Sequence, residues 1–381
     1  MSDLNQQTHF GLVFENFLKS IPGVTGMIML SILIILSVFA EFFSPNNPYK
    51  NNYDHIYIPP SKIHFLDENN NFSFRPFVYK RIEEYDLETF ETFYKEDFSQ
   101  KKNIRFFERT WEYKLFNLIP SNLHLFTLED SSEPFFLLGS DKLGRDVWSR
   151  ACLSGRISLT LSMLAVLSSV FIGSFVGILS GFYGGLTDWI IQRIVEIFTA
   201  LPALPLWIAL AALIPPYMDS FDVFMIMIFI FTLLGWTLTA REIRGKVMSF
   251  AKTDFINSAK EIGASDLRII FIHIYPNCMS HIIVVSTLTI PQIILSEAFL
   301  SFIGIGIQEP MTSWGFMMKN AQSIETLGSH LWILSPVSFI IFAVLGFNFV
   351  GDGIRDAVDP YTVRENGNSI RSDKFIQKIA L

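Results

Sequence analysis

Long apolar runs with almost no charge recur along this chain. An α-helix of about 20 apolar residues is long enough to cross the hydrocarbon core of a bilayer. The pattern therefore predicts an all-α polytopic membrane protein with six transmembrane helices. The six runs are residues 24–43, 157–181, 194–214, 221–240, 277–305 and 331–351.

Charged residues are scarce, which agrees with a membrane location. Only 17% of the 381 residues are charged and half are apolar, against roughly 25% charged in an average soluble protein. The formal net charge of -7 argues against a nucleic-acid partner, because phosphate backbones attract basic surfaces. Cys152 and Cys278 lie far apart, and neither has closely spaced Cys or His neighbours. We therefore expect no metal site and no disulfide scaffold.

Basic residues in the short loops set the expected orientation, because cytoplasmic loops carry an excess of Lys and Arg. The loop between spans four and five and the tail after span six are rich in them. The opposite short loops, 215–220 and 306–330, carry only Lys319. Both termini are therefore expected inside, as a cytoplasmic segment 1–23 and a cytoplasmic tail 357–381.

Residues 44–139, between the first two spans, are rich in charged and aromatic residues and contain no run long enough to span. Segments 62–66 and 72–75 alternate around an Asn-rich turn, as a β-hairpin does. Residues 87–98 fit a helix, and aromatic stretches between 104 and 116 fit strands. Because disordered segments are poor in aromatics, we predict a small α+β extracytoplasmic domain inserted between the first two helices.

The predicted transmembrane core, residues 140–356, contains the other five helices. Its first helix carries Gly173, Gly177, Gly181 and Gly185 at intervals of four. This spacing places them on one helix face, where another backbone can approach closely. We interpret the row as a helix-packing surface.

An ATP-binding loop is missing from the sequence. Gly245 and Lys246 are followed by Val247, and position 240 is Ala. The second glycine and the magnesium-binding hydroxyl of the phosphate-cradling loop are therefore lacking. We expect this chain to bind no ATP or other cofactor and to catalyse no reaction of its own.

The loop after the fourth span, 250–275, has the pattern of two short capped helices. Thr253 or Asp254 fits the N-cap of the first helix, and Ser265 fits that of the second. Gly263 is suited to end the first helix in a left-handed conformation.

One face of the first short helix is apolar, because Phe255, Ala259 and Ile262 recur at spacings of four and three. Beneath a membrane bundle, such a face suits either of two contacts. It can meet a cytosolic partner protein, or it can lie against lipid headgroups.

A longer motif runs through this loop. Asn257-Ser258-Ala259 is followed by Gly263, and Pro276 stands thirteen positions later. This spacing resembles the coupling loop of binding-protein-dependent ABC importer permeases. Asn257 and Ser258 replace the first two residues of the family's common Glu-Ala-Ala, and Tyr275 replaces a usual Leu. The resemblance implies a coupling role for this loop, but it does not imply the acidic contact of the family's Glu, because Asn257 stands at that position.

Four flanking motifs resemble the second permease subunit of dipeptide and oligopeptide importers. The resemblance covers about 135–361, together with the first span. The motifs are GSDKLGRDVWSR at 139–150, GFYGG at 181–185, SEAFLSFIG at 296–304 and GDGIRDAVDP at 351–360.

The resemblance implies a type I ABC importer permease fold in the bacterial cytoplasmic membrane, in contact with lipid. It implies a second homologous permease subunit, two cytosolic ABC ATPases that hold ATP and magnesium, and an extracytoplasmic binding protein that delivers a peptide. The loop 250–275 would dock on an ATPase, with Phe255, Ala259 and Ile262 as apolar contacts and Gly263 allowing the turn.

Ionisable residues within or beside the spans are further candidates. Glu297 is an acid inside an apolar run, and such acids face a polar cavity or a partner. Two roles are open for it: contact with substrate in the translocation pathway, or a structural hydrogen bond. Spacings of three and four predict structural charge pairs. These are Asp141 with Arg145, Asp146 with Arg150, and a ladder of Asp352, Arg355 and Asp359.

Other classes of function predict different features. The same architecture would also serve an importer of metal complexes or sugars, because the sequence does not fix the substrate. An ion-driven secondary transporter predicts inverted repeats and midplane acids in broken helices, and only Glu297 fits. A membrane receptor predicts an intracellular output domain, which the tail does not supply.

Overall fold

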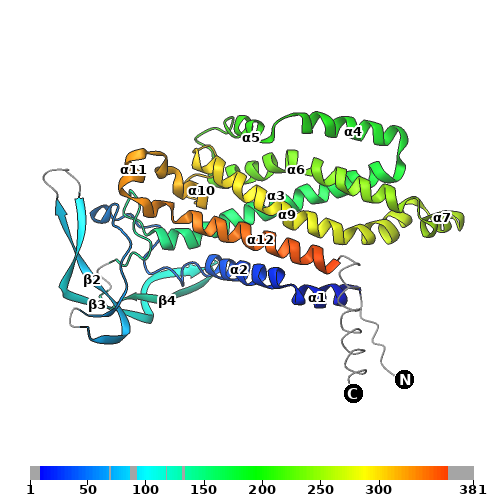
Figure 1. Ribbon diagram of the computed structural model, residues 1–381. Coiled ribbons are helices and arrows are strands. Elements are labelled where there is room, and N and C mark those ends of the chain that lie inside the picture. The colour runs from blue at the N-terminus through cyan, green and yellow to red at the C-terminus, as the bar shows by residue number, and fades with distance from the viewer. Residues whose placement is uncertain (1–8, 68–69, 86–91, 117, 131–133, 359–381) are drawn as a thin grey trace, which may run out of the picture.

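A bundle of long helices carries a β-sheet at one end in the computed structural model of the chain (Figure 1). The structure describes residues 9–358, apart from 68–69, 86–91, 117 and 131–133. The sheet and the short helix α7 lie at opposite ends of the bundle. The inserted domain and the 250–275 loop are thus separated by the length of the spans.

Two helices precede the sheet, α1 (His9–Lys19) and α2 (Ile21–Val38). The bundle continues after it with α3 (Val147–Tyr183), α4 (Gly185–Ala200), α5 (Ala203–Ala211), α6 (Ser220–Phe250) and α7 (Asp254–Glu261). It is completed by α8 (Asp266–Arg268), a π-helical turn (Ile269–Ile274), α9 (Tyr275–Phe302), α10 (Trp314–Met317), α11 (Ile324–Ser329) and α12 (Pro336–Val358).

Within the described residues, five helical segments are long and apolar enough to cross a membrane, and α4 with α5 makes a sixth if the bent pair is one span. The prediction of one continuous helix over 194–214 is wrong, because α4 and α5 meet at 79°. Leu201 has an extended backbone before Pro202. Proline lacks an N–H and disfavours helical backbone in the residue before it.

The other five predicted spans are present, with shifted ends. The second helix begins at Val147 and not near 157, because Asp146 caps it by accepting hydrogen bonds from Trp148 N and Ser149 N. The fifth begins as early as Asp266, because the helix continues through the π turn. The first ends at Val38, five residues before its predicted end.

The glycine row joins α3 to α6. A Cβ atom added to Gly173 or Gly177 would lie 2.6 Å from a carbonyl oxygen of α6, and one added to Gly181 would lie 2.8 Å from another. These three glycines confirm the predicted packing surface. Gly185 does not belong to it, because this residue begins α4 and an added Cβ would meet nothing within 4 Å.

The described part of the insertion forms a four-stranded antiparallel sheet in the order β1-β2-β3-β4. Leu66 pairs with Phe72, which confirms the predicted hairpin. Val78, Ile104, Leu128 and Phe135 form a small buried core. The strands are β1 (His64–Leu66), β2 (Phe72–Tyr85), β3 (Thr92–Leu115) and β4 (Ile119–Leu128).

The predicted helix over 87–98 is wrong for residues 92–98, and residues 86–91 lie outside the described part. Residues 92–97 pair with β2, with Thr92 opposite Tyr85 and Asp97 opposite Lys80. Pairing with the long β2 strand overrides the local helical pattern, since β structure depends on cross-strand neighbours. The described insertion is thus a β-domain with one 3-10 turn, Tyr53–His55, and not α+β.

Backbone contacts fix the sheet to the helices. Leu125 N donates to Phe42 O at 2.8 Å, just after the end of α2. Asn46 exchanges two hydrogen bonds with the backbone of Phe135, at 2.6 and 3.2 Å. Trp148 Nε1 donates to Phe43 O at 2.9 Å, which ties the start of α3 to the same turn.

Candidate coupling, pathway and docking sites

The loop 250–275 folds as α7, a tight turn and the start of the fifth span. Gly263 has a φ of +82°, which confirms the predicted left-handed end of α7. Ser265 caps α8 by accepting a hydrogen bond from Arg268 N at 3.4 Å. Thr253 stands at the N-cap position of α7, but its hydroxyl donates to Phe250 O and caps nothing.

The predicted apolar face of α7 is divided between two environments. Ala259 is buried in the bundle core together with Ile256, whereas Phe255 and Ile262 are exposed. Ile256 and Ala259 therefore hold α7 onto the bundle, and Phe255 and Ile262 are available to a partner. The expectation that Ala259 offers a partner contact is wrong, because one turn of helix carries both the inward and the outward surface.

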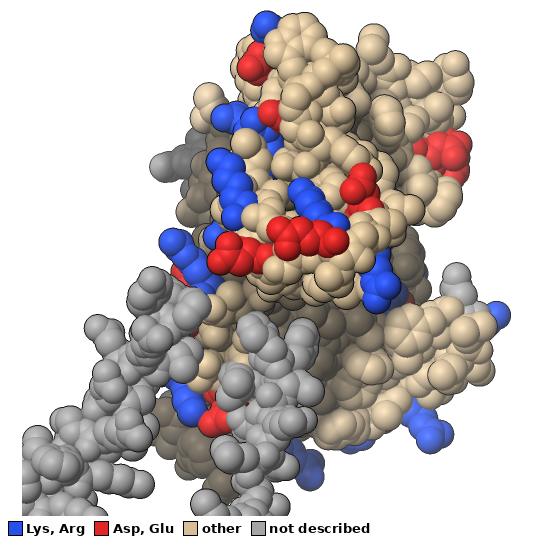
Figure 2. Space-filling model, turned by 90° about the vertical axis from the view of Figure 1, so that its right-hand side faces the viewer, with Lys and Arg blue, Asp and Glu red and all other residues tan. Residues whose placement is uncertain are grey.

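The end of the molecule that carries α7 presents charges of both signs around apolar patches (Figure 2). Asn257 and Ser258 are exposed on α7 beside these charges, and Leu267 of α8 adds a third large exposed apolar side chain. The exposed charged side chains of this segment are Lys252, Asp254, Lys260, Glu261, Asp266 and Arg268.

Pro276, the last residue of the coupling-loop motif, lies inside a helix. It stands in the first turn of α9, inside the continuous helical segment Asp266–Phe302. The π turn Ile269–Ile274 comes directly before it. A proline removes one backbone donor, and π turns within helices are often functional. Residues 266–275 of the predicted loop are thus already the beginning of the fifth span.

Glu297 is completely buried between α9 and α3. Its carboxylate accepts hydrogen bonds from Ser301 Oγ at 2.7 Å and from Ser158 Oγ at 3.2 Å. Ser158 Oγ also accepts from Trp314 N at 3.2 Å, so α10 joins the same network. Of the two roles open to Glu297, this arrangement favours the structural one.

A polar cavity of about 750 Å³ lies between α6, α9 and α12. His281 Nε2 lies 3.4 Å from Glu242 Oε2 in its wall. Asn277, His281 and Gln292 follow one face of α9 at helical spacing, which is the signal that sequence reasoning missed. The charged and polar lining side chains are Glu242, Lys246, Asn277, Ser280, His281, Thr289, Gln292 and Arg355.

Arg355 lines this cavity, and the Asp352–Arg355 step of the predicted ladder is wrong. No ion pair joins Arg355 to Asp352 among the residues that the structure describes, and Asp359 lies outside them. Spacing along a helix brings two side chains within reach of each other, but the Arg355 side chain lines the cavity and does not pair with Asp352.

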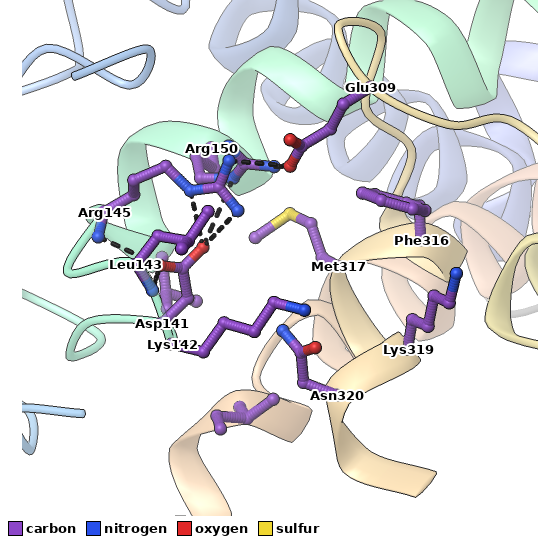
Figure 3. Close-up of a pocket in the computed structure, with 12 residues that line it drawn as sticks. Asp141, Lys142, Leu143, Arg145, Arg150, Glu309, Phe316, Met317, Lys319 and Asn320 are labelled. Atoms are coloured by element: carbon purple, nitrogen blue, oxygen red, sulfur yellow. Dashed lines mark hydrogen bonds and ion pairs between the residues drawn. The ribbon is translucent and has the colours of Figure 1, made fainter. Parts of the chain in front are cut away.

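At the sheet end, four charged residues form one cluster (Figure 3). Asp141 accepts from Arg145 at 2.8 Å, which confirms that pair. Asp146 does not pair with Arg150 but caps α3 and accepts from Ser149 Oγ. Arg150 instead donates to Glu309 at 3.2 Å, and Arg145 donates to the same Glu309 oxygen at 2.6 Å.

Glu309 is the member of the cluster that sequence reasoning missed. Burial would raise the pKa of its carboxyl, but the hydrogen bonds and charges of Arg145 and Arg150 outweigh burial and lower this pKa. Lys142 and Lys319 line the adjacent cavity of about 300 Å³. A small cavity with surplus positive charge suits an acidic group of a docking partner.

Comparison with known proteins identifies the family. The sequence model described as "binding-protein-dependent transport system inner membrane component" matches residues 173–364. The chain belongs to this family. A second model, described as the N-terminal TM domain of oligopeptide transport permease C, matches residues 8–60 of the permease. By family, the permease has the type I ABC importer permease fold and is a multi-pass protein of the inner membrane.

Named relatives of the permease are peptide permeases. The oligopeptide permease OppC of Bacillus subtilis (strain 168) is 39% identical over 58% of this chain and 70% of that protein. The dipeptide permease DppC of the same strain is 39% identical over 61% of this chain and 70% of that protein. A solved chain of the MetNI methionine ABC transporter aligns with a TM-score of 0.43 and 17% identity, covering 54% of this chain and 94% of that one.

Proposed function

We propose that this chain is a transmembrane permease subunit of an ATP-driven importer that moves dipeptides or oligopeptides across the cytoplasmic membrane. The observation that carries the proposal is its 39% identity to permeases named for oligopeptide and dipeptide transport. Its partners are a second homologous permease subunit, two cytosolic ATPases that hold ATP and magnesium, and an extracytoplasmic binding protein. This chain binds no cofactor, and both of its termini are cytoplasmic.

Coupling to an ATPase is assigned to α7 and the turn after it. Phe255, Ile262 and Leu267 are exposed there, at the end of the bundle opposite the sheet. Ile256 is fully buried beneath them. A push on the exposed side chains is therefore transmitted to the bundle, since packed interfaces move as rigid bodies. Gly263 lets the chain reverse between α7 and the fifth span.

The cavity between α6, α9 and α12 is assigned to the translocation pathway in place of Glu297. Its wall combines Glu242 and Arg355 with amide side chains such as Gln292. A peptide carries opposite charges at its ends and amides between them, so this lining matches its chemistry. Glu297 has a supporting role, because its carboxylate is engaged by two hydroxyls.

Uptake tests the substrate. The complete transporter, with its binding protein, is reconstituted in vesicles and supplied with radiolabelled dipeptides, oligopeptides, sugars or metal chelates. We expect ATP-dependent uptake of peptides only. Uptake of a sugar or metal chelate without peptide uptake would overturn the substrate class, and uptake driven by an ion gradient without ATP would overturn the importer class.

A matched pair of variants tests the coupling surface. Ile262 is 85% exposed at the α7 end, and Ile324 is 88% exposed on α11 at the sheet end. Ile262→Asp is expected to abolish co-purification of the ATPases, whereas Ile324→Asp retains it. Equal retention of the ATPases by both variants would show that α7 is not the contact.

A further inference from the structure

The turn that joins β3 to β4 carries an exposed apolar cluster. Phe116, Leu118 and Ile119 are all exposed, and Leu118 is exposed by 80%. Leu115 pairs with Ile119 and closes the hairpin beneath them. We call Phe116, Leu118 and Ile119 the apolar tip. Adjacent exposed apolar side chains of this size mark a contact with a membrane or another protein.

The middle of this hairpin is fixed beside the end of α2. Leu125 of β4 donates its N–H to Phe42 O at 2.8 Å. On β3, the Phe107 ring lies 6.3 Å from the Phe42 ring. The six residue steps from Leu125 to Ile119 span about 20 Å as a strand. The apolar tip is therefore held at a set distance from the first span.

The direction of the hairpin places the apolar tip near the membrane boundary. In Figure 1 the β3–β4 hairpin runs from the sheet back toward the helices, and its end reaches the level of the sheet end of α2. β2, in contrast, lies beyond the end of the bundle. The tip thus lies level with the sheet end of the first span, where a helix that crosses a bilayer would leave the hydrocarbon.

The surface of α2 continues the same apolar band. Ile28, Ile32, Ile35 and Phe39 are exposed at helical spacings of four and three along the first span. This face is not covered by other described parts of the chain, so it is open to lipid in a membrane-spanning helix. The apolar tip adds to this lipid-facing band at its end.

The hairpin also has the residue order of a membrane interface. Behind the apolar tip comes the exposed Lys114 on β3, followed by the part-buried Tyr113 and Trp111, whose rings pack on His124. An exposed basic residue such as Lys114 suits the level of lipid headgroups, with the apolar side chains of the tip deeper.

We propose that the apolar tip inserts into the lipid leaflet beside the first span and anchors the inserted β-domain on the membrane surface. The partner is the boundary between the headgroups and acyl chains of the bilayer. This anchor would fix the orientation of the sheet relative to the bundle. It rests on the chain spanning a membrane and is independent of peptide transport.

Site-directed fluorescence tests the anchor. Both native cysteines, Cys152 and Cys278, are buried, so a thiol-reactive, environment-sensitive dye labels an introduced cysteine. Leu118→Cys reports on the apolar tip, and Phe74→Cys, 93% exposed on β2, is the matched control. The full chain is placed in phosphatidylcholine/phosphatidylglycerol nanodiscs with or without nitroxide-labelled lipid.

The dye at 118 should emit at shorter wavelength, lose most of its emission to the lipid nitroxide and be shielded from aqueous iodide. The dye at 74 should be quenched by iodide and little by the lipid nitroxide. If iodide quenches both sites equally, the anchor is refuted. Shielding at 118 that requires the binding protein or the second permease subunit would assign the tip to that protein and also overturn the proposal. Phe116→Cys repeats the test at the same tip if Leu118→Cys does not fold.

Discussion

The contact between α3 and α6 can be tested with two single-atom additions. At Gly177, an added Cβ would lie 2.6 Å from Ala240 O and 3.0 Å from Ile243 Cβ, so Gly177→Ala must push the two helices apart. At Gly245, in α6, an added Cβ meets nothing within 4 Å. Gly245→Ala is therefore the matched control, with the same change of residue and no collision.

The expected difference in folding free energy between the two variants comes from one contribution that they share and one that only Gly177→Ala has. Replacing glycine by alanine inside a helix favours folding by roughly 1 kcal/mol, and this term is common to both. Overpacking a tight interface costs about 1–3 kcal/mol, and only Gly177→Ala incurs it. We therefore expect Gly177→Ala to be about 1–3 kcal/mol less stable than Gly245→Ala.

Thermal unfolding measures this difference in the purified chain. Cys152 and Cys278 are buried, so a fluorogenic thiol reagent reports unfolding as they become accessible. The midpoint of Gly177→Ala should fall below that of Gly245→Ala by roughly 2 °C or more. Equal midpoints would refute the close approach of α3 and α6 at this glycine, and with it the interpretation of the glycine row.

Three further predictions concern the loop, the topology and the charge cluster. Gly263→Val should reduce ATP-driven uptake while the chain still reaches the membrane, because a side chain at positive φ costs about 1–2 kcal/mol. In the control Gly328→Val, an added Cβ meets no atom within 4 Å, and this variant should transport normally. Equal uptake by the two variants would contradict the role of the turn at Gly263 in coupling. A membrane-impermeant thiol reagent added outside cells should label Phe74→Cys but not Lys260→Cys, and the reverse pattern would invert the topology. Because the pKa of Glu309 is lowered, its ion pairs stabilise the fold fully above about pH 4.5 and lose this effect as the pH falls further. Glu309→Gln should therefore lower the unfolding midpoint at neutral pH, and its difference from the native chain should shrink as the pH falls below about 4.5. A pH-independent difference would contradict the ionic origin.

The sheet shows why local pattern misassigned part of the insertion. Residues 92–98 fit a helix when viewed alone, but β2 supplies cross-strand partners from Tyr85 back to Lys80. Strand stability comes from those partners, and no local window contains them. The hairpin at 66–72 was predictable, because both of its strands lie within one short segment.

The charged residues show a similar division. Asp141 and Arg145 are joined by a tight turn, so sequence spacing was enough to pair them. Arg150 pairs with Glu309 and not with Asp146, although Arg150 and Glu309 are 159 positions apart in the sequence. Asp146 is engaged by the backbone N–H groups that every helix start leaves unpaired.

The sequence by itself determined five of the six candidate spans to within their ends, because a run of about 20 apolar residues is long enough to cross the hydrocarbon core of a bilayer. It also determined the left-handed turn at Gly263, because few other residues adopt that backbone conformation. Only the tertiary structure decided that Ala259 faces the bundle while Ile262 faces outward, that hydroxyls from two helices enclose Glu297, and that the apolar tip reaches the level of α2. These features depend on which surfaces meet in space, and residues far apart in the sequence supply the opposing surfaces.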